Sequence, residues 1–334
     1  MSPALAPGRN DSEIVGHGTA KRLRKHLRGD PRDVSRRMDN LAAWDRLLEG
    51  SPGFPSPRLT AWDRDGHVVE HEFVEHQSSL QDLLAAGPSD TLTTALSRAA
   101  ELVARIHGAA APEQRLPTHG IDLGRRPSAF MALAVSDYAE CSGAELDVWG
   151  MLQHDTELQE ALEGWQRTLT VPTAHQGPRH GDVRPDQFLV RADGSLVVID
   201  LEEFGWGATV TDLSALAGSI LFDAMTRTFG SVIDEGDDVL SIHQGFMDRG
   251  EAALLAASPA LVSLVSSYEH ASGRRVDLMQ LTCGAGWFIM ERIIARSKMS
   301  YRLAAGERAI AGVGRQAIVD PASALPLFDR EARA

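Results

Sequence analysis

One segment, residues 180–207, constrains the fold of this chain more than any other part of the sequence. It holds two short apolar runs separated by an Asp193-Gly194 pair. Asp-Gly between apolar runs predicts a β-hairpin, because both residues tolerate the positive φ angles of a tight turn. Asp182 lies in a polar loop before the first run, and Asp200 ends the second. The hairpin is therefore expected to bring these two carboxylates, 18 residues apart in the sequence, to one site.

Two carboxylates that converge on a cleft can hold Mg²⁺ and orient a hydroxyl group, which phosphoryl transfer requires. The HGD sequence that ends at Asp182, followed by Gln187 and then by Asp200, resembles the catalytic and metal-binding loops of the aminoglycoside phosphotransferase and choline kinase family. The resemblance implies an α+β, protein-kinase-like fold that uses ATP and Mg²⁺. It implies a small, β-rich nucleotide-binding lobe at residues 1–77 and a large, mainly helical catalytic and acceptor-binding lobe at residues 78–334.

The resemblance also implies a role for each residue of these loops. In that family the Asp of HGD faces the acceptor hydroxyl, which implies a catalytic role for Asp182. The Asp after the second strand binds magnesium, a role that passes to Asp200. The family usually has Asn where this chain has Gln187, and the shared amide oxygen implies a second metal ligand. Asp212 matches an Asp that braces the catalytic loop, and His180 is expected to support the same loop.

The specificity of this interpretation comes from the combination of residues. His-Gly-Asp alone is ordinary turn chemistry, whereas an amide at plus five, a hairpin and a second Asp at plus 18 together are not. Glu202 and Glu203 follow the second Asp directly. Either could assist at the metal, but the preferred interpretation is that they are solvated loop carboxylates.

A lysine that reaches the nucleotide phosphates is expected near the N-terminus. In the family a short glycine turn precedes the strand that carries this lysine, and Gly16 and Gly18 provide such a turn here. Lys21 is the best match by position, with Lys25 as the alternative. Both lie in a basic run, and such runs are often simply solvated.

A helix is predicted over residues 33–49, because apolar residues recur there at steps of three and four. Asp30 suits its start and Gly50 its end. The resemblance implies that a carboxylate on this helix pairs with the lysine of the strand. Asp39 is the candidate for that nucleotide-site role, and an exposed Asp39 is the alternative.

A second hairpin is predicted at residues 58–74, around an Asp65-Gly66 turn. The resemblance implies that the inter-lobe connection follows it and that backbone groups at Phe73 and Val74 hydrogen-bond the adenine. The nearby HEFVEH sequence could suggest zinc, but its two histidines are five residues apart, unlike the HExxH spacing of metalloproteases.

The remaining chain is predicted to be mostly helical. His107, near the end of the first long helix, is expected to be a packing residue. The predicted helices are residues 91–111, several within 126–170, and then 212–228, 237–249, 251–268 and 274–303.

Composition limits the possible partners and locations. A net charge of −13 argues against nucleic-acid binding. Two distant cysteines, Cys141 and Cys283, indicate a reducing compartment without a disulfide framework or zinc site. No signal peptide is evident, and the most apolar window, residues 278–290, is too short to span a bilayer. We therefore expect a cytoplasmic protein with no membrane partner.

The acceptor is less constrained. Residues 271–334 hold ten Arg or Lys against six Asp or Glu, and Arg292, Arg296 and Arg302 cluster there as candidate acceptor-binding residues. A positive segment favours an acidic acceptor over a polycationic aminoglycoside. The sequence thus leaves open a serine or threonine of a biosynthetic, lanthipeptide-type precursor peptide, or a small molecule such as an antibiotic or sugar. A pseudokinase that binds nucleotide or peptide without transfer is the third possibility.

Overall fold

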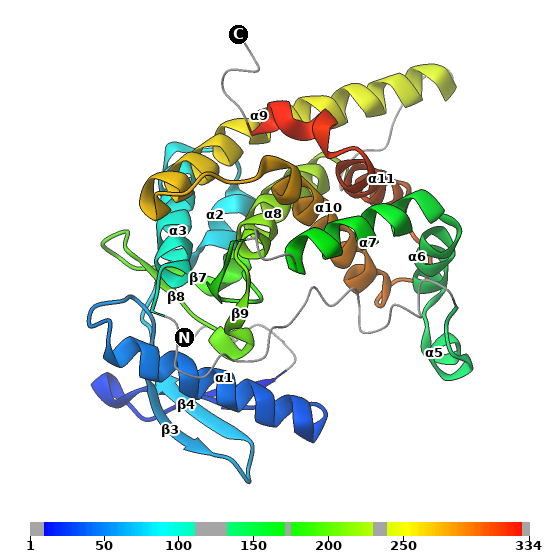
Figure 1. The fold of residues 1–334 in the computed structure, drawn as a ribbon. Coiled ribbons are helices and arrows are strands. Elements are labelled where there is room, and N and C mark those ends of the chain that lie inside the picture. Colours follow the sequence, from blue (N-terminus) through cyan, green and yellow to red (C-terminus); the bar gives the residue numbers. More distant parts are fainter. Residues whose placement is uncertain (1–9, 111–131, 171–174, 230–238, 329–334) are drawn as a thin grey trace.

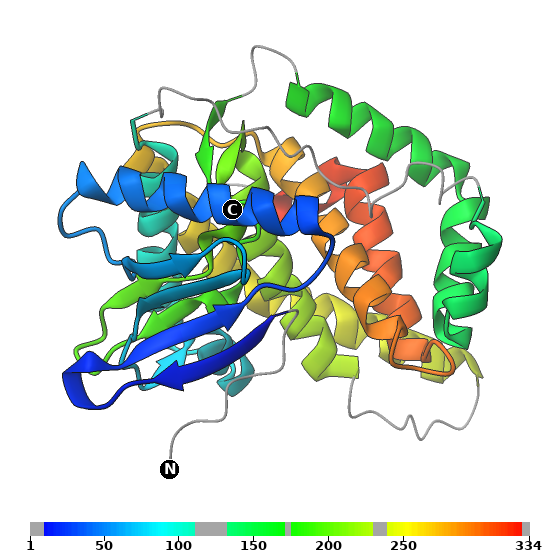
Figure 2. The ribbon, with the colours of Figure 1, turned by 90° about the horizontal axis from the view of Figure 1, so that it is seen from below.

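The computed structural model describes residues 10–110, 132–170, 175–229 and 239–328 (Figures 1 and 2). The N-terminal part contains an antiparallel sheet with the strand order β1-β2-β4-β3. Its strands are β1 (Asp11–Val15), β2 (Arg22–His26), β3 (Leu59–Asp63) and β4 (Val68–Glu72). The β3–β4 pair confirms the predicted second hairpin.

Helix α1 (Pro31–Glu49) lies between this sheet and the rest of the molecule (Figure 1). The Asp30 carboxylate accepts a hydrogen bond of 2.9 Å from the backbone N–H of Arg32, and Pro31 starts the first turn. Gly50 follows the last turn. These are the expected end signals, because an N-cap side chain satisfies a backbone donor that the helix leaves free. The helix buries one apolar face, which comprises Val34, Met38, Leu41, Trp44 and Leu48.

A short connection joins the two parts of the molecule. After β4 ends at Glu72, the next strand is β5 (Ser78–Ser79), which pairs with β7 (Phe188–Val190) instead of the first sheet. Helix α2 (Leu80–Ala86) follows at once, capped by Ser79. The chain therefore leaves the N-terminal sheet within residues 73–77, close to the lobe boundary that the sequence predicts.

The predicted central hairpin is confirmed. Strands β7 and β8 (Leu196–Val198) pair antiparallel, with Phe188 opposite Val198 and Val190 opposite Leu196. Gly194 in the turn has a φ of 75°, which glycine adopts without strain. A separate two-stranded sheet joins β6 (Gln176–Arg179) to β9 (Gly205–Ala208).

Helices form most of the C-terminal part. They are α3 (Asp90–His107), α5 (Val135–Glu140), α6 (Gly143–His154), α7 (Thr156–Thr170), α8 (Val210–Phe229), α9 (Val239–Ser272), α10 (Leu278–Ser297) and α11 (Ala305–Val319). Short 3₁₀ turns are η1 (Gly18–Ala20), η2 (Pro185–Gln187), η3 (Leu201–Glu203) and η4 (Pro321–Leu327).

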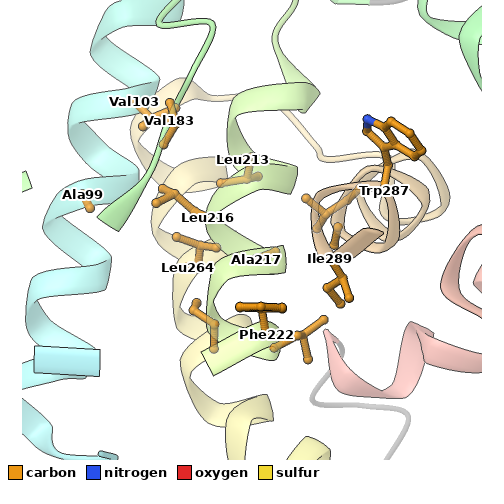
Figure 3. Packing of buried hydrophobic residues seen from close by; sticks show 14 of the residues in the cluster. Ala99, Val103, Val183, Leu213, Leu216, Ala217, Phe222, Leu264, Trp287 and Ile289 are labelled. Carbon is orange, nitrogen blue, oxygen red and sulfur yellow. The ribbon is translucent and has the colours of Figure 1, made fainter. Parts of the chain in front are cut away.

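Helix α8 is the centre of the C-terminal core. Figure 3 shows its buried side chains between α3 on one side and α10 on the other, with α9 behind. The approach of α8 to α10 depends on Gly218, where a Cβ would lie 2.8 Å from the carbonyl oxygen of Ala285. Leu213, Leu216 and Ala217 are fully buried at this contact.

Several predicted helix ends differ from the structure. Helix α3 begins at Asp90, one residue before the predicted start, and Ser89 caps it through its hydroxyl and the N–H of Leu92 at 3.1 Å. Residues 237–249 and 251–268 were expected to form two helices, but α9 runs through Gly250 and Pro259 without a break. Burial of one face of α9 against α3 and α8 offsets the weak helix propensity of these two residues.

The end of the chain also differs. Helix α10 stops at Ser297, short of the predicted residue 303, and α11 was not predicted. The buried face of α11 is built largely from small residues. Its buried residues are Ile310, Ala311, Gly314, Ala317 and Ile318.

Within the described residues, one segment is long and apolar enough to cross a membrane by length and composition. It is residues 244–272 of α9, and 39% of its apolar window is buried inside the protein. The same helix packs on α3 and α8, as a core helix does. The sequence had pointed instead to residues 278–290 as the most apolar window.

Candidate active site

The backbone of the loop after β6 is held in place by one buried carboxylate, that of Asp212. Asp212 accepts hydrogen bonds from the backbone N–H groups of His180, at 2.7 Å, and Gly181, at 3.1 Å. The His180 ring is buried, and its Nε2 lies 3.0 Å from the carbonyl oxygen of Ile199. These contacts fix the loop against both α8 and the end of β8, which is the support that the sequence predicted for Asp212 and His180.

The backbone at position 181 accommodates glycine and no larger residue. Its φ is 88°, and a Cβ there would overlap the carbonyl oxygen of Glu203. The loop that carries Asp182 and the loop that follows Asp200 can therefore touch only because this residue lacks a side chain.

Asp212 has a further partner that the sequence did not indicate. His107 Nε2 lies 3.1 Å from Asp212 Oδ2, and its Nδ1 lies 2.8 Å from the Tyr268 hydroxyl. Burial alone would raise the pKa of Asp212, but the hydrogen bond from His107 and nearby positive charge hold it below its usual value. His107 is buried as predicted, yet it does more than pack, since it links α3 and α9 to the catalytic loop. No spacing in the sequence connects residues so far apart.

Asp182 lies at the surface of a cavity. Its side chain is 42% exposed, and Arg184 Nη1 lies 3.6 Å from its Oδ2. Withdrawal from bulk solvent raises the pKa of Asp182, and the charges of Arg184 and His180 offset part of that effect. A carboxylate held at a cavity wall can orient or deprotonate a hydroxyl.

Gln187 forms two contacts within its own loop. The residue is buried, and its amide oxygen accepts a hydrogen bond of 3.0 Å from the backbone N–H of Arg184. Its amide nitrogen lies 3.5 Å from Asp182 Oδ2. The backbone N–H of Arg184 needs an acceptor and the Asp182 carboxylate needs a donor, so the amide oxygen faces Arg184 and the amide nitrogen faces Asp182. The amide oxygen accepts one hydrogen bond within the loop and keeps a second lone pair, and its role as a metal ligand stays a prediction.

Asp200 follows β8 in a left-handed conformation with a φ of 69°. Its carboxylate forms an ion pair with Lys25 of β2, and both side chains line the cavity. Burial favours the neutral acid, but the charge of Lys25 outweighs it, so the pKa of Asp200 lies below its usual value. The lysine side chain is 14% exposed and the Asp200 side chain 20% exposed.

Lys25, the alternative, lies in the cavity, and Lys21, the first choice, lies outside it. Lys21 Nζ forms an exposed ion pair with Glu75 at 2.7 Å and lies 5.2 Å from the centre of the Phe73 ring. Lys21 precedes β2, whereas Lys25 lies within the strand. Four residues of strand span about 13 Å. Lys21 therefore reaches the inter-lobe connection and not Asp200.

Asp39 does not pair with either lysine. It is half-exposed and forms an ion pair of 2.6 Å with Arg64. The face of α1 that approaches the cavity carries Asp33 and two arginines. Arg36 pairs with Glu203 at 2.6 Å, and Arg37 pairs with Glu202 at 3.2 Å. The prediction for Asp39 was wrong because the residue lies on a different face of the helix.

Glu202 and Glu203 are not solvated loop residues. Their side chains are 12% and 23% exposed, and both also line the cavity. Asn40 adds a hydrogen bond of 2.9 Å to the Glu202 carbonyl oxygen. Three polar residues of α1 thus hold the loop after Asp200. Sequence reasoning missed this role, although a charged Arg-Arg pair in the apolar stripe of α1 was a possible signal.

Phe73 and Val74 lie in the connection between the two parts, both half-buried. The Val74 carbonyl oxygen lies 3.0 Å from His76 Nδ1. Their contact with adenine stays a prediction.

Lys25, Asp182 and Asp200 line one cavity with a volume of about 1670 Å³. It extends from Lys25 and Asp200 past Asp182 to the surfaces of α8 and α10. Arg292 and Arg296 of α10 line it as well. Arg302, the third predicted acceptor-binding residue, is exposed after the end of α10 and does not line the cavity.

Comparison with known proteins gives a consistent result. The model of the phosphotransferase enzyme family matches residues 14–240. Choline kinase LicA from Streptococcus pneumoniae aligns with a TM-score of 0.52 and 11% identity over 92% of this chain and 89% of its own. LicA in complex with AMP gives 0.51 and 11% over 94% and 93%. The ADP-bound aminoglycoside phosphotransferase APH(2'')-Ib gives 0.47 and 13% over 92% and 94%.

Among curated proteins, the comparison by sequence finds no significant match. The LicA alignments establish a common fold, a small antiparallel sheet joined to a large helical part. The family model covers more than half of the chain. On these grounds the chain has the protein-kinase-like fold and belongs to the phosphotransferase enzyme family.

Proposed function

We propose that this protein transfers the γ-phosphate of ATP to a hydroxyl group of a small molecule, with Mg²⁺ as its metal cofactor. The observation that carries this proposal is the single cavity that Lys25, Asp182 and Asp200 line together. Membership in a phosphotransferase family and the fold shared with an AMP-bound kinase support a nucleotide as the phosphate donor.

The donor set fits Mg²⁺. Asp200 supplies carboxylate oxygens at the cavity, and Glu202 lies two residues away on the same wall. In the part of the chain that the structure describes, no three His, Cys, Asp or Glu side chains converge on one point. That suits Mg²⁺, which usually uses one or two carboxylates together with substrate phosphates. The bound ion supplies positive charge that neutralises phosphate oxygens during transfer.

Each central residue has a distinct role in this proposal. Asp182 orients the acceptor hydroxyl and takes its proton, Asp200 holds the metal, and Lys25 binds phosphate. Backbone groups at Phe73 and Val74 hydrogen-bond the adenine. Catalysis of this kind depends mainly on positioning and on charge stabilisation, so the rigid support from Asp212 and from α1 is part of the chemistry.

A small-molecule acceptor agrees with the relatives, which are named as choline kinase and aminoglycoside phosphotransferase. A precursor peptide, the other acceptor that the sequence left open, has no counterpart among them. A location in the cytoplasm, where ATP and reduced cysteines coexist, completes the proposal.

One observation favours a second candidate, a nucleotide-binding pseudokinase. The Gln187 oxygen is hydrogen-bonded within the loop, which leaves Asp200 with fewer partners for a metal. Incubation with ATP, Mg²⁺ and a panel of hydroxyl compounds separates the two candidates. Phosphorylated product, detected by mass spectrometry, supports the kinase. Tight nucleotide binding without ADP release on any acceptor supports the pseudokinase.

Replacing Lys25 by Ala should weaken binding of Mg·ATP about tenfold or more, because a hydrogen bond to a charged group contributes about 1.5–3 kcal/mol. The matched control is Lys21→Ala, which should change the affinity less than about twofold, since Lys21 lies outside the cavity. Isothermal titration calorimetry measures both. A larger loss for Lys21→Ala than for Lys25→Ala would show that the wrong lysine has been chosen.

Replacing Gln187 by Leu should lower kcat about tenfold or more, because the buried amide then no longer holds Arg184 and Asp182 in place. The Mg²⁺ concentration for half-maximal activity should change less than about threefold, within ordinary context effects. Asp200→Asn is the comparison and should raise that concentration. If Gln187→Leu raised the Mg²⁺ requirement as much as Asp200→Asn does, Gln187 would be a metal ligand after all.

A further inference from the structure

The part of the cavity lined by α7, α8 and α10 is rich in aromatic side chains, but two of the rings are already covered by arginine. The guanidinium carbon of Arg292 lies 5.1 Å from the centre of the Phe288 ring. That of Arg296 lies 4.6 Å from the centre of the Phe222 ring. All four residues line the cavity. An arginine over an aromatic face occupies the position that a cationic ligand would need.

The two arginines bring positive charge to the cavity, and the charge of Arg292 acts on the carboxylate of Asp182. They are one turn apart on α10, so they lie on the same face of the helix, where like charges repel. Within the described residues neither has a carboxylate partner, and the buried Nε of Arg292 has no hydrogen-bond acceptor. A buried donor without an acceptor costs free energy. The buried Nε–H of Arg292 is therefore open to a ligand that accepts a hydrogen bond.

Two other polar side chains in this part of the cavity also have a buried atom without a hydrogen-bond partner among the described residues. Trp165 is 5% exposed, and its indole N–H has no acceptor in the described structure. Thr226 Oγ1 is likewise buried without a hydrogen-bond partner there. The open groups here thus include two N–H donors and a hydroxyl that can donate, beside one acceptor, Asp223 Oδ2. A ligand that matches them presents oxygen lone pairs.

The carboxylates nearby are engaged in other contacts. Asp223 forms an ion pair with Arg227 of the same helix. Glu307 accepts a hydrogen bond of 2.9 Å from the backbone N–H of Ala304 at the start of α11. Glu291 also has a partner. Among the described residues, no ion pair joins these carboxylates to Arg292 or Arg296, so both guanidinium groups can bind a ligand.

We propose that the acceptor of this enzyme carries an oxyanion, a phosphate ester or a carboxylate, that Arg292 and Arg296 bind while its hydroxyl faces Asp182. The inference rests on the function proposed above, whose acceptor site it specifies. It separates this protein from relatives that are named for a cationic acceptor, choline. A quaternary ammonium group here would meet two guanidinium charges and rings that are already covered.

Binding of simple ions tests the site directly. Sulfate, acetate and tetramethylammonium are titrated against the protein in saturating Mg·ADP and followed by tryptophan fluorescence, because Trp165 and Trp287 line the cavity. Sulfate should bind, and Arg292→Gln or Arg296→Gln should weaken it about tenfold or more. Arg302→Gln, an exposed arginine outside the cavity, should leave the affinity unchanged. The ratio of acetate to sulfate affinity indicates which oxyanion the acceptor carries.

Several results would overturn the inference: no sulfate binding by the wild type, equal sulfate affinity in the wild type and both cavity variants, or tighter binding of tetramethylammonium than of sulfate. Arg292→Lys, which keeps the charge, should retain more affinity than Arg292→Gln, and thermal unfolding shows that each variant is folded. Lys25→Ala should lose nucleotide affinity and keep the Arg292-dependent sulfate site. If the wild type did not bind nucleotide, the proposed function would be wrong, but the sulfate result would still hold.

Discussion

Replacing Asp182 by Asn should lower kcat by about 10²–10⁴-fold, the range for loss of a positioned general base. The reason is geometric: Asp182 lies in the loop after β6 and lines the cavity, beside Arg184 and Gln187. Asn has nearly the same shape and can still hydrogen-bond, but it cannot accept the hydroxyl proton. Steady-state ATP turnover with an accepted substrate measures the effect.

The matched control is Asp186→Asn. Asp186 lies in the same loop, is 55% exposed and also contacts Arg184, at 3.3 Å. Asp186→Asn should lower kcat less than about threefold, as expected for the loss of an exposed ion pair. Nucleotide affinity should stay near that of the wild type in both variants, because Lys25 and Asp200 are untouched. Near-normal turnover in Asp182→Asn would remove Asp182 from the chemistry.

Local signals in the sequence predicted the parts of this site that depend on local geometry. The Asp193-Gly194 turn fixes the central hairpin, and the hairpin fixes where Asp200 emerges. The same holds for α1, whose Asp30 cap and Gly50 end were both legible. These features depend on the φ and ψ preferences of a few neighbouring residues, so they can be read without knowledge of the remaining fold.

The errors concern contacts between elements that are distant in the sequence. Lys21 and Lys25 are two equally basic positions of one segment, and only the place where β2 meets the Asp200 loop distinguishes them. Asp39 had the expected charge, but the rotation of α1 about its axis determines which face meets the cavity. The sequence gives the period of a helix and not its rotation against a distant partner.

The basic face of α1 changes how the two parts of the molecule are connected. In the resembled family a carboxylate on this helix pairs with the strand lysine, whereas here the lysine pairs with Asp200. The helix contributes Arg36 and Arg37, which bind the two glutamates after Asp200. The helix thus contacts the loop that follows Asp200 through its arginines. The position of Asp200 therefore depends on α1.

Replacing Asp212 by Ala should lower the free energy of unfolding by about 3–5 kcal/mol, the range for removing one partner of a buried ionic network. The substitution leaves the N–H groups of His180 and Gly181 and the ring of His107 without their shared acceptor in the core. Asp212→Asn should also destabilise the protein, because Asn has one acceptor oxygen and must turn an N–H group toward a donor. Urea denaturation measures both changes.

The control for this prediction is Asp248→Ala, an exposed carboxylate on α9, which should change the stability by less than about 0.5 kcal/mol. Measuring the free energy of unfolding at several pH values gives a second test, because a loss of packing alone would not depend on the ionisation of Asp212. Because the pKa of Asp212 is held below its usual value, its charged form contributes stability above that value, and the contribution is lost as the pH falls through the lowered pKa. The gap between the wild type and Asp212→Ala should therefore narrow in acid. A gap that stayed constant there, or a variant as stable as the wild type at neutral pH, would mean that the charge of Asp212 does not hold the loop.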